Sequence, residues 1–166
     1  MTNKTSKTIP FDTEKSIRKA AGRRAGLKHW KLDSGGKTFK WSTKMERVSL
    51  IREGIPFASI EVISDRLASP IRTALSIVGI PQTTYNKKKR EESLLDSRHS
   101  ELILVITELL DFGLEVFNEE EEKFQRWLKK PNLSLGGHSP ESLLDTTTGI
   151  DEVHYALNRI EFGNCA

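Results

Sequence analysis

The sequence predicts an all-α protein, and three observations lead to that prediction. Apolar residues in the middle of the chain recur at spacings of three and four, as Ile60, Ile63 and Leu67 do. The segment from Asp96 to Phe117 carries a wide apolar face, as a long amphipathic helix does. Glycine, proline and helix-capping residues separate these stretches. The chain is therefore expected to be a series of helices joined by tight turns.

Length and composition exclude several classes of protein. The 166 residues suffice for one medium domain or two small ones, and a hydrophobic fraction of 36% permits a core. Cys165 is the single cysteine, which excludes an intramolecular disulfide framework and a cysteine-based zinc site. The longest unbroken apolar run has five residues, whereas about 20 are needed to cross a bilayer. No apolar segment follows Met1, so we expect no secretory signal, no membrane partner and a cytoplasmic location.

Charge is distributed unevenly along the chain. Residues 1–40 contain 11 Lys/Arg and 3 Asp/Glu, which gives +8, whereas residues 101–166 contain 5 and 13, which gives −8. Because such asymmetry acts on association more than on folding, it suggests two different partners. The alternative is a solubilising tail on an ordinary domain.

Residues 1–42 are expected to form a basic, poorly ordered extension. Thr13 to Leu27 is compatible with a short basic helix, and Lys31 to Lys37 reads as a loop from its Asp, Ser and Gly residues. Trp30 and Trp41 are unusual for a free tail, and the sequence leaves open whether they dock on the body. Several cations of this extension are suited to nucleic-acid phosphates: Arg18, Lys19, Arg23, Arg24, Lys28 and Lys31.

Residues 43–95 have the outline of a helix-turn-helix DNA-binding region. Thr43 to Arg52 and Ser59 to Leu67 are the first two expected helices. In the third, Ser69 is the expected N-cap and Pro70 the first helical residue, and Gly79 ends the helix. A polar and basic helix then follows the glycine turn, as in the helix-turn-helix motif.

The segment from Gln82 to Arg90 is the expected recognition helix, with Tyr85 as its apolar anchor to the body. One departure from the motif is that Leu75 stands four residues before the glycine, where a small residue is usual. The alternative is a solvated helix end whose cations favour the helix dipole. The expected contacts to base edges are Gln82, Thr83, Thr84 and Asn86, and those to phosphates are Lys87, Lys88, Lys89 and Arg90.

Residues 96–166 are expected to form a second helical domain. The apolar face of Asp96 to Phe117 must be buried in a core or against another copy of the chain, and the pattern does not distinguish the two. If the chain forms a homodimer, residues 96–117 are the expected dimerisation segment. Glu119 to Glu122 suit the first turn of the next helix, where negative charge is favourable. Thr146 to Gly149 reads as a turn, and Ile150 to Glu161 as the last helix.

A pattern of spaced residues in this half resembles the toxin-binding domain of the Xre/MbcA/ParS-type antitoxins, which bacteria pair with RES-domain toxins. The resemblance covers about residues 90–166, and it is specific because many glycines, prolines and a tryptophan keep their spacing. The residues that carry it are Trp127, Leu128, Pro131, Asn132, Leu135, Gly136, Gly137, Ser139, Pro140, Leu143, Leu144, Asp145, Thr146, Gly149, Val153, Leu157, Arg159, Ile160, Glu161 and Gly163.

The resemblance implies an all-helical antitoxin that dimerises, binds a RES toxin and represses its own operon. It further implies that the toxin consumes NAD and that the antitoxin blocks access to its active site. Fixed loops commonly carry contact surfaces, and an acidic C-terminal half suits a basic nucleotide-binding cleft. The expected toxin contacts are Gly136, Gly137, His138, Arg159, Glu161, Phe162, Gly163, Asn164, Cys165 and Ala166.

No catalytic, cofactor or metal site is expected. Gly36-Lys37-Thr38 ends like a phosphate-binding loop, but the leading glycine of that motif would fall at Lys31, so a nucleotide site is rejected. The four histidines lack metal-ligand spacing, and Cys165 lies at a chain end without a fixed base. The alternative function is a stand-alone dimeric helix-turn-helix transcription regulator without a toxin partner.

Overall fold

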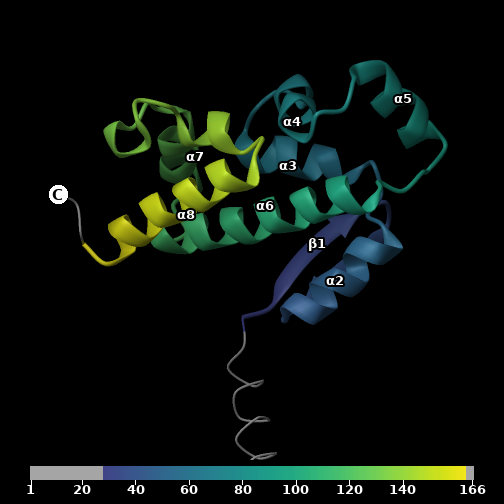
Figure 1. The fold of residues 1–166 in the computed structure, drawn as a ribbon, viewed down its shortest axis with the longest axis horizontal. Helices are drawn as coiled ribbons and strands as arrows, with labels where there is room; N and C mark the ends of the chain where they lie inside the picture. The colour runs from purple at the N-terminus through teal and green to yellow at the C-terminus, as the bar shows by residue number, and fades with distance from the viewer. Residues whose placement is uncertain (1–27, 164–166) are drawn as a thin grey trace, which may run out of the picture.

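The computed structural model describes residues 28–163, which form a short hairpin followed by a series of helices (Figure 1). The all-α prediction is confirmed, apart from one two-stranded sheet. No helix in residues 28–163 combines the length and apolarity needed to cross a bilayer. The elements are β1 (Trp30–Ser34), β2 (Lys37–Trp41), α2 (Lys44–Glu53), α3 (Ser59–Leu67), α4 (Ile71–Val78), α5 (Gln82–Arg90), α6 (Ser97–Val116), α7 (Glu121–Lys129), the 3-10 helices η1 (Leu133–Leu135) and η2 (Pro140–Leu143), and α8 (Thr147–Glu161).

Helix α6 runs through the centre of the molecule, and elements from both halves of the chain pack around it. Helix α8 lies along it, and α2, α3 and β1 pack on its other sides (Figure 1). Ile103, Leu104 and Ile106 are fully buried. The expected long helix is therefore present, and much of its apolar face is buried within one chain. Homodimerisation through residues 96–117 stays a prediction.

The interpretation of Lys31 to Lys37 as a loop is wrong, because these residues belong to an antiparallel hairpin. Trp30 pairs with Trp41 and Leu32 with Phe39. Gly35 and Gly36 have φ values of 58° and 72°, as the tight turn of a hairpin requires. The missed signal was the alternation of apolar residues on both sides of this glycine pair.

The two tryptophans dock on the body of the protein. Their rings stack with centroids 6.3 Å apart, and Trp41 is almost fully buried. The indole Nε1 of Trp41 donates to the carboxylate of Glu108 on α6 at 2.6 Å. Residues 28–42 are thus an ordered part of the fold, whereas the expected helix over Thr13 to Leu27 lies outside the described residues.

Side-chain caps set several helix starts. Thr43 and Glu46 form a capping box at α2, and Asp96 caps α6 by accepting from the backbone N–H of His99. Two expectations are wrong. Thr146 to Gly149 is not a turn, because Thr146 caps α8, which begins at Thr147. Helix α4 has Pro70 as its N-cap, and the hydroxyl of Ser69 donates to Glu141 instead.

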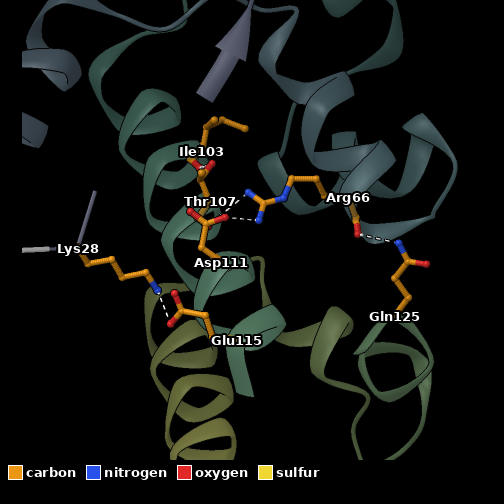
Figure 2. A network of polar contacts seen from close by, with 7 residues as sticks. All are labelled: Lys28, Arg66, Ile103, Thr107, Asp111, Glu115 and Gln125. Carbon is orange, nitrogen blue, oxygen red and sulfur yellow. Dashed lines mark hydrogen bonds and ion pairs between the residues drawn. The ribbon is translucent and has the colours of Figure 1, made fainter. Parts of the chain in front are cut away.

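Polar contacts join the C-terminal end of α3 to the second half of the chain (Figure 2). The Arg66 guanidinium pairs with Asp111 on α6 at 2.5 Å. The amide of Gln125 on α7 donates to the carbonyl of Arg66 at 3.4 Å, and the ammonium of Lys129 donates to the carbonyl of Ala68. With the Ser69–Glu141 bond, these contacts attach the connection between α3 and α4 to α6, α7 and η2.

Two candidate binding surfaces

Helices α4 and α5 form the helix-turn-helix. Helix α4 ends at Gly79, whose φ of 78° is the left-handed conformation that glycine adopts without strain. Ile80 is buried after the turn, and Pro81 occupies the N-cap position of α5. The buried residues of α4 include Ala74, Leu75 and Val78, so the motif accommodates Leu75 in the core.

Tyr85 holds α5 against α3. Its side chain is 3% exposed, and burial is the main cause that raises the pKa of its hydroxyl. Beside it, the Lys89 ammonium forms an ion pair with Glu61 of α3 and holds the pKa of that carboxyl below its usual value. The expected role of Tyr85 as an anchor is confirmed.

The expected DNA contacts fall into two groups around α5. At 3.6 residues per turn, Thr83, Lys87 and Arg90 lie on the side of the helix opposite Tyr85. Lys88 and Lys89 lie nearer the body, where Lys88 pairs with Glu91 at 3.4 Å and Lys89 with Glu61. The outward cations are therefore Lys87 and Arg90.

The polar residues of α5 are also exposed. The Gln82 amide donates to the Oδ1 atom of Asn86 at 3.1 Å, which orients two of the expected base contacts relative to each other. Thr84 is exposed as well, but it lies two residues from each of them and so points to another side of α5. Arg72, in the first turn of α4, is an exposed cation that sequence reasoning missed. Its position matters because the first helix of the motif crosses the DNA backbone.

A second exposed surface lies on α8. Residues 152, 155, 159 and 162 follow one another at spacings of three and four and line a shallow hollow together with Asn158. Tyr155 is 60% exposed and Phe162 73% exposed. Large exposed apolar side chains on one helix face are typical of an interaction surface.

The expected glycine loop is part of the same side of the molecule. Gly136 has a φ of 65° and Gly137 a φ of 83°. The backbone N–H of Asn132 donates to the backbone carbonyl of His138 at 3.0 Å and closes the loop. A second hollow, lined by Gly136 among others, shares Glu152 with the hollow on α8.

The structure thus brings together some of the expected toxin contacts and separates others. Gly136, Arg159 and Phe162 line the two hollows that share Glu152. Glu161 lies two residues after Arg159, roughly 160° around α8 from it, and so faces another side. Gly137, His138 and Gly163 are exposed. Asn164, Cys165 and Ala166 lie outside the described residues.

Sequence reasoning missed two of the most exposed apolar residues of the C-terminal domain. Leu133 in η1 is 96% exposed, and Tyr155 interrupts the polar face of α8. A signal was available for Tyr155, because it lies off the buried face formed by Val153, Ala156 and Leu157. For Leu133 the pattern contained no such signal.

The fold defines a helix-turn-helix protein that carries a second helical domain with an exposed apolar surface. Comparison with known families gives this class its identity. Residues 46–105 match the antitoxin Xre-like helix-turn-helix domain, and residues 113–163 match the antitoxin Xre/MbcA/ParS C-terminal toxin-binding domain. The chain belongs to the Xre/MbcA/ParS antitoxins.

Individual relatives are similar over most of their length. An "Antitoxin Xre" of Photorhabdus laumondii is 28% identical over 115 residues, which are 69% of this chain and 78% of the relative. An "Antitoxin Xre" of Yersinia enterocolitica is 28% identical over 116 residues, or 70% and 78% of the two chains. A protein of Sphingobium sp. named "Prs ADP-ribosylating antitoxin" is 27% identical over 131 residues, or 74% and 82%.

Proposed function

We propose that this antitoxin neutralises a RES-type, NAD-consuming toxin by covering its active site, and that it represses its own operon by binding operator DNA. The observation that carries the proposal is the pair of exposed aromatic side chains, Tyr155 and Phe162, that line one hollow on the matched toxin-binding domain. Aromatic side chains at the centre of an interface often supply most of its binding energy. The protein acts by binding, not by catalysis, in the bacterial cytoplasm.

The DNA-binding part of the proposal is supported by the outward side of α5. Thr83, Lys87 and Arg90 are exposed there, and the Tyr85 anchor holds the helix in place. Helix-turn-helix proteins usually bind operators as dimers with two half-sites, so we expect a homodimer on the operator.

Toxin neutralisation is tested by inducing the open reading frame adjacent to this gene, with and without the antitoxin, and by measuring growth and cellular NAD. Co-expression of the wild-type chain should restore both. The double variant Tyr155→Ala/Phe162→Ala should lose this protection while remaining folded. A matched control is Met45→Ala/Leu94→Ala, which removes two exposed apolar side chains elsewhere and should protect fully.

A deletion of residues 162–166 separates the two activities. It should weaken neutralisation and leave DNA binding intact. Equal loss of both activities, or loss of neither, would count against the proposed role of the C-terminal end. A neighbouring gene product that is harmless, or that stays toxic beside soluble antitoxin, would instead favour a stand-alone transcription regulator.

DNA binding is tested by the salt dependence of the affinity for the DNA upstream of the gene. Lys87→Ala/Arg90→Ala should make the negative slope of log K against log salt shallower by about 2, because each phosphate contact contributes about 0.9 to it. Lys88→Ala/Lys89→Ala removes the same charge from cations that pair with acids within the chain, so it should change the slope less. Equal slopes for the wild type and the first variant would argue against α5 as the DNA-binding helix.

A further inference from the structure

The β1–β2 hairpin has an apolar face and a basic face. Trp30, Leu32 and Trp41 point toward the body, where Leu32 and Trp41 are 1% exposed. Because side chains alternate along a strand, the next cross-strand pairs face outward. In the first of these pairs, Lys31 lies directly opposite Lys40, and both are exposed.

The positive charge of this outer face is only partly balanced. The carboxylate of Asp33 binds Lys31 at 2.6 Å and accepts from Thr38 at 2.5 Å, and these contacts hold the pKa of Asp33 below its usual value. Within residues 28–163, Lys40 of this face forms no ion pair. Lys37 forms none either, but it follows the turn and lies opposite the buried Ser34, so it is exposed at the turn and not on the outer face. Like charges directly opposite each other destabilise a hairpin, so an external polyanion would relieve this repulsion.

The hairpin turn lies at the same end of the molecule as the C-terminal end of α5. A Cβ atom on Gly35 would lie 3.4 Å from the ring of Pro56, and Pro56 forms a bridge with Leu94. The segment around Leu94 follows α5 directly, and the amide of Ser93 donates to the carbonyl of Lys88 at 3.0 Å. In Figure 1, the arrowhead of β1 points toward the end of α6 where the connection from α5 arrives.

From this arrangement we propose that the outer face and turn of the hairpin contact the DNA phosphate backbone beside the groove that α5 enters. Lys40 on the outer face and Lys37, the exposed residue that follows the turn, are the principal contacts. The hairpin lies outside both family matches, which cover residues 46–105 and 113–163. Residues 1–27, which lead into β1, add seven Lys/Arg against two Asp/Glu. The inference rests on the proposed DNA binding and extends it by a second, sequence-independent contact.

The hairpin is held firmly enough to present these lysines as a fixed surface. The indole of Trp41 is bonded to Glu108, and the same carboxylate pairs with Arg47 of α2 at 2.7 Å. Side chains fixed on a rigid ribbon lose less conformational freedom on binding than side chains of a free tail. The contact should therefore add affinity at any DNA sequence.

The test uses the full chain and fluorescence anisotropy with two labelled duplexes of equal length, one of random sequence and one from the DNA upstream of the gene. Lys37→Ala/Lys40→Ala should make the slope of log K against log salt shallower by about 2 on both duplexes, since two phosphate contacts are lost. The preference for the upstream DNA should not change, because phosphate contacts carry no sequence information. Lys37→Arg/Lys40→Arg should keep the wild-type slope.

The control is Lys123→Ala/Lys130→Ala, which removes the same charge from exposed lysines on and just after α7. If this control variant makes the slope of log K against log salt equally shallow, the inference is overturned, because the loss of net positive charge would then explain the effect. A wild-type slope in Lys37→Ala/Lys40→Ala, with a shallower slope in Lys87→Ala/Arg90→Ala, would overturn the hairpin contact alone. A wild-type chain that binds neither duplex would overturn the proposed DNA binding as well, and would leave an acidic protein as the partner for this face.

Discussion

At the scale of single residues, neighbours of the same type have different roles. The run from Lys87 to Arg90 is uniform in charge, yet Lys89 pairs with Glu61 and Lys88 with Glu91. Each residue turns the helix by about 100°, so adjacent side chains point to different surroundings. A basic run on a recognition helix therefore contains both structural and DNA-facing cations.

The N-cap of α6 offers a residue-scale prediction. Asp96→Ala should lower the free energy of unfolding by about 1 kcal/mol at neutral pH, because the backbone N–H of His99 loses its acceptor. Asp96→Ser should retain most of the stability. Urea unfolding monitored by circular dichroism measures both differences.

The same cap should depend on pH. The bond from the His99 amide, the largest cause, holds the pKa of Asp96 below its ordinary value of 3.8. A lowered pKa in the folded state means that the carboxylate stabilises the protein above pH 3.8, and that this contribution is lost as the pH falls through the folded value. The difference in the free energy of unfolding between the wild type and Asp96→Ala should become smaller in acid. A difference that stays the same at all pH values would contradict this role of Asp96.

At the scale of elements, a glycine sets how closely η2 approaches α8. A Cβ atom on Gly149 would lie 1.9 Å from the carbonyl oxygen of Leu143, so η2 would have to move. Gly149→Ala should therefore destabilise the protein by about 1–3 kcal/mol, despite the better helix propensity of alanine. Thr148→Ala, an exposed substitution one residue earlier, should cost much less in the same denaturant titration.

The ion pair between α3 and α6 provides a second prediction at this scale. The Arg66 and Asp111 side chains are 25% and 28% exposed, which lies between a surface pair and a buried one. A double-mutant cycle with Arg66→Ala and Asp111→Ala should give a coupling energy of about 1 kcal/mol. The exposed pair of Lys123 with Glu120 is the matched control, and its coupling energy should be close to zero. Similar values for the two pairs would contradict a structural role for Arg66.

At the scale of the whole molecule, the two matched domains share one core. Helix α6 packs on α2 and α3 from the first half and on α7 and α8 from the second. The contacts of Arg66, Ala68 and Ser69 with α6, α7 and η2 add polar connections between the halves. Neither half keeps its buried surface when the other unfolds, so the described chain should unfold as one unit.

Tryptophan fluorescence can test this cooperativity. In Trp127→Phe, the remaining tryptophans are Trp30 and Trp41, which report on the hairpin. Their urea midpoint should coincide with that of the helical circular dichroism signal, because both follow a single transition. An earlier fluorescence midpoint would show that the hairpin detaches from a folded helical body.

Much of the fold follows from local sequence patterns. Apolar spacing located α3 and α6 to within a residue or two, Gly79 marked the end of α4, and the polar, basic segment after the glycine turn gave α5. The hairpin was missed because its polar residues and glycine pair have the composition of a loop. The predicted site residues on α5 and on the C-terminal domain remain predictions, although the structure separates those that face outward from those that pair within the chain.

The sequence by itself determined the helical fold class, the helix-turn-helix outline and the resemblance to a toxin-binding domain. These depend on spacing along the chain, which reflects helix period and backbone conformation. Only the tertiary structure decided that Lys89 pairs with Glu61, 28 residues away, and that Trp41 bonds to Glu108, 67 residues away. Such contacts depend on how the elements pack, because a side chain's partner is set by its neighbours in space and not by its neighbours in the chain.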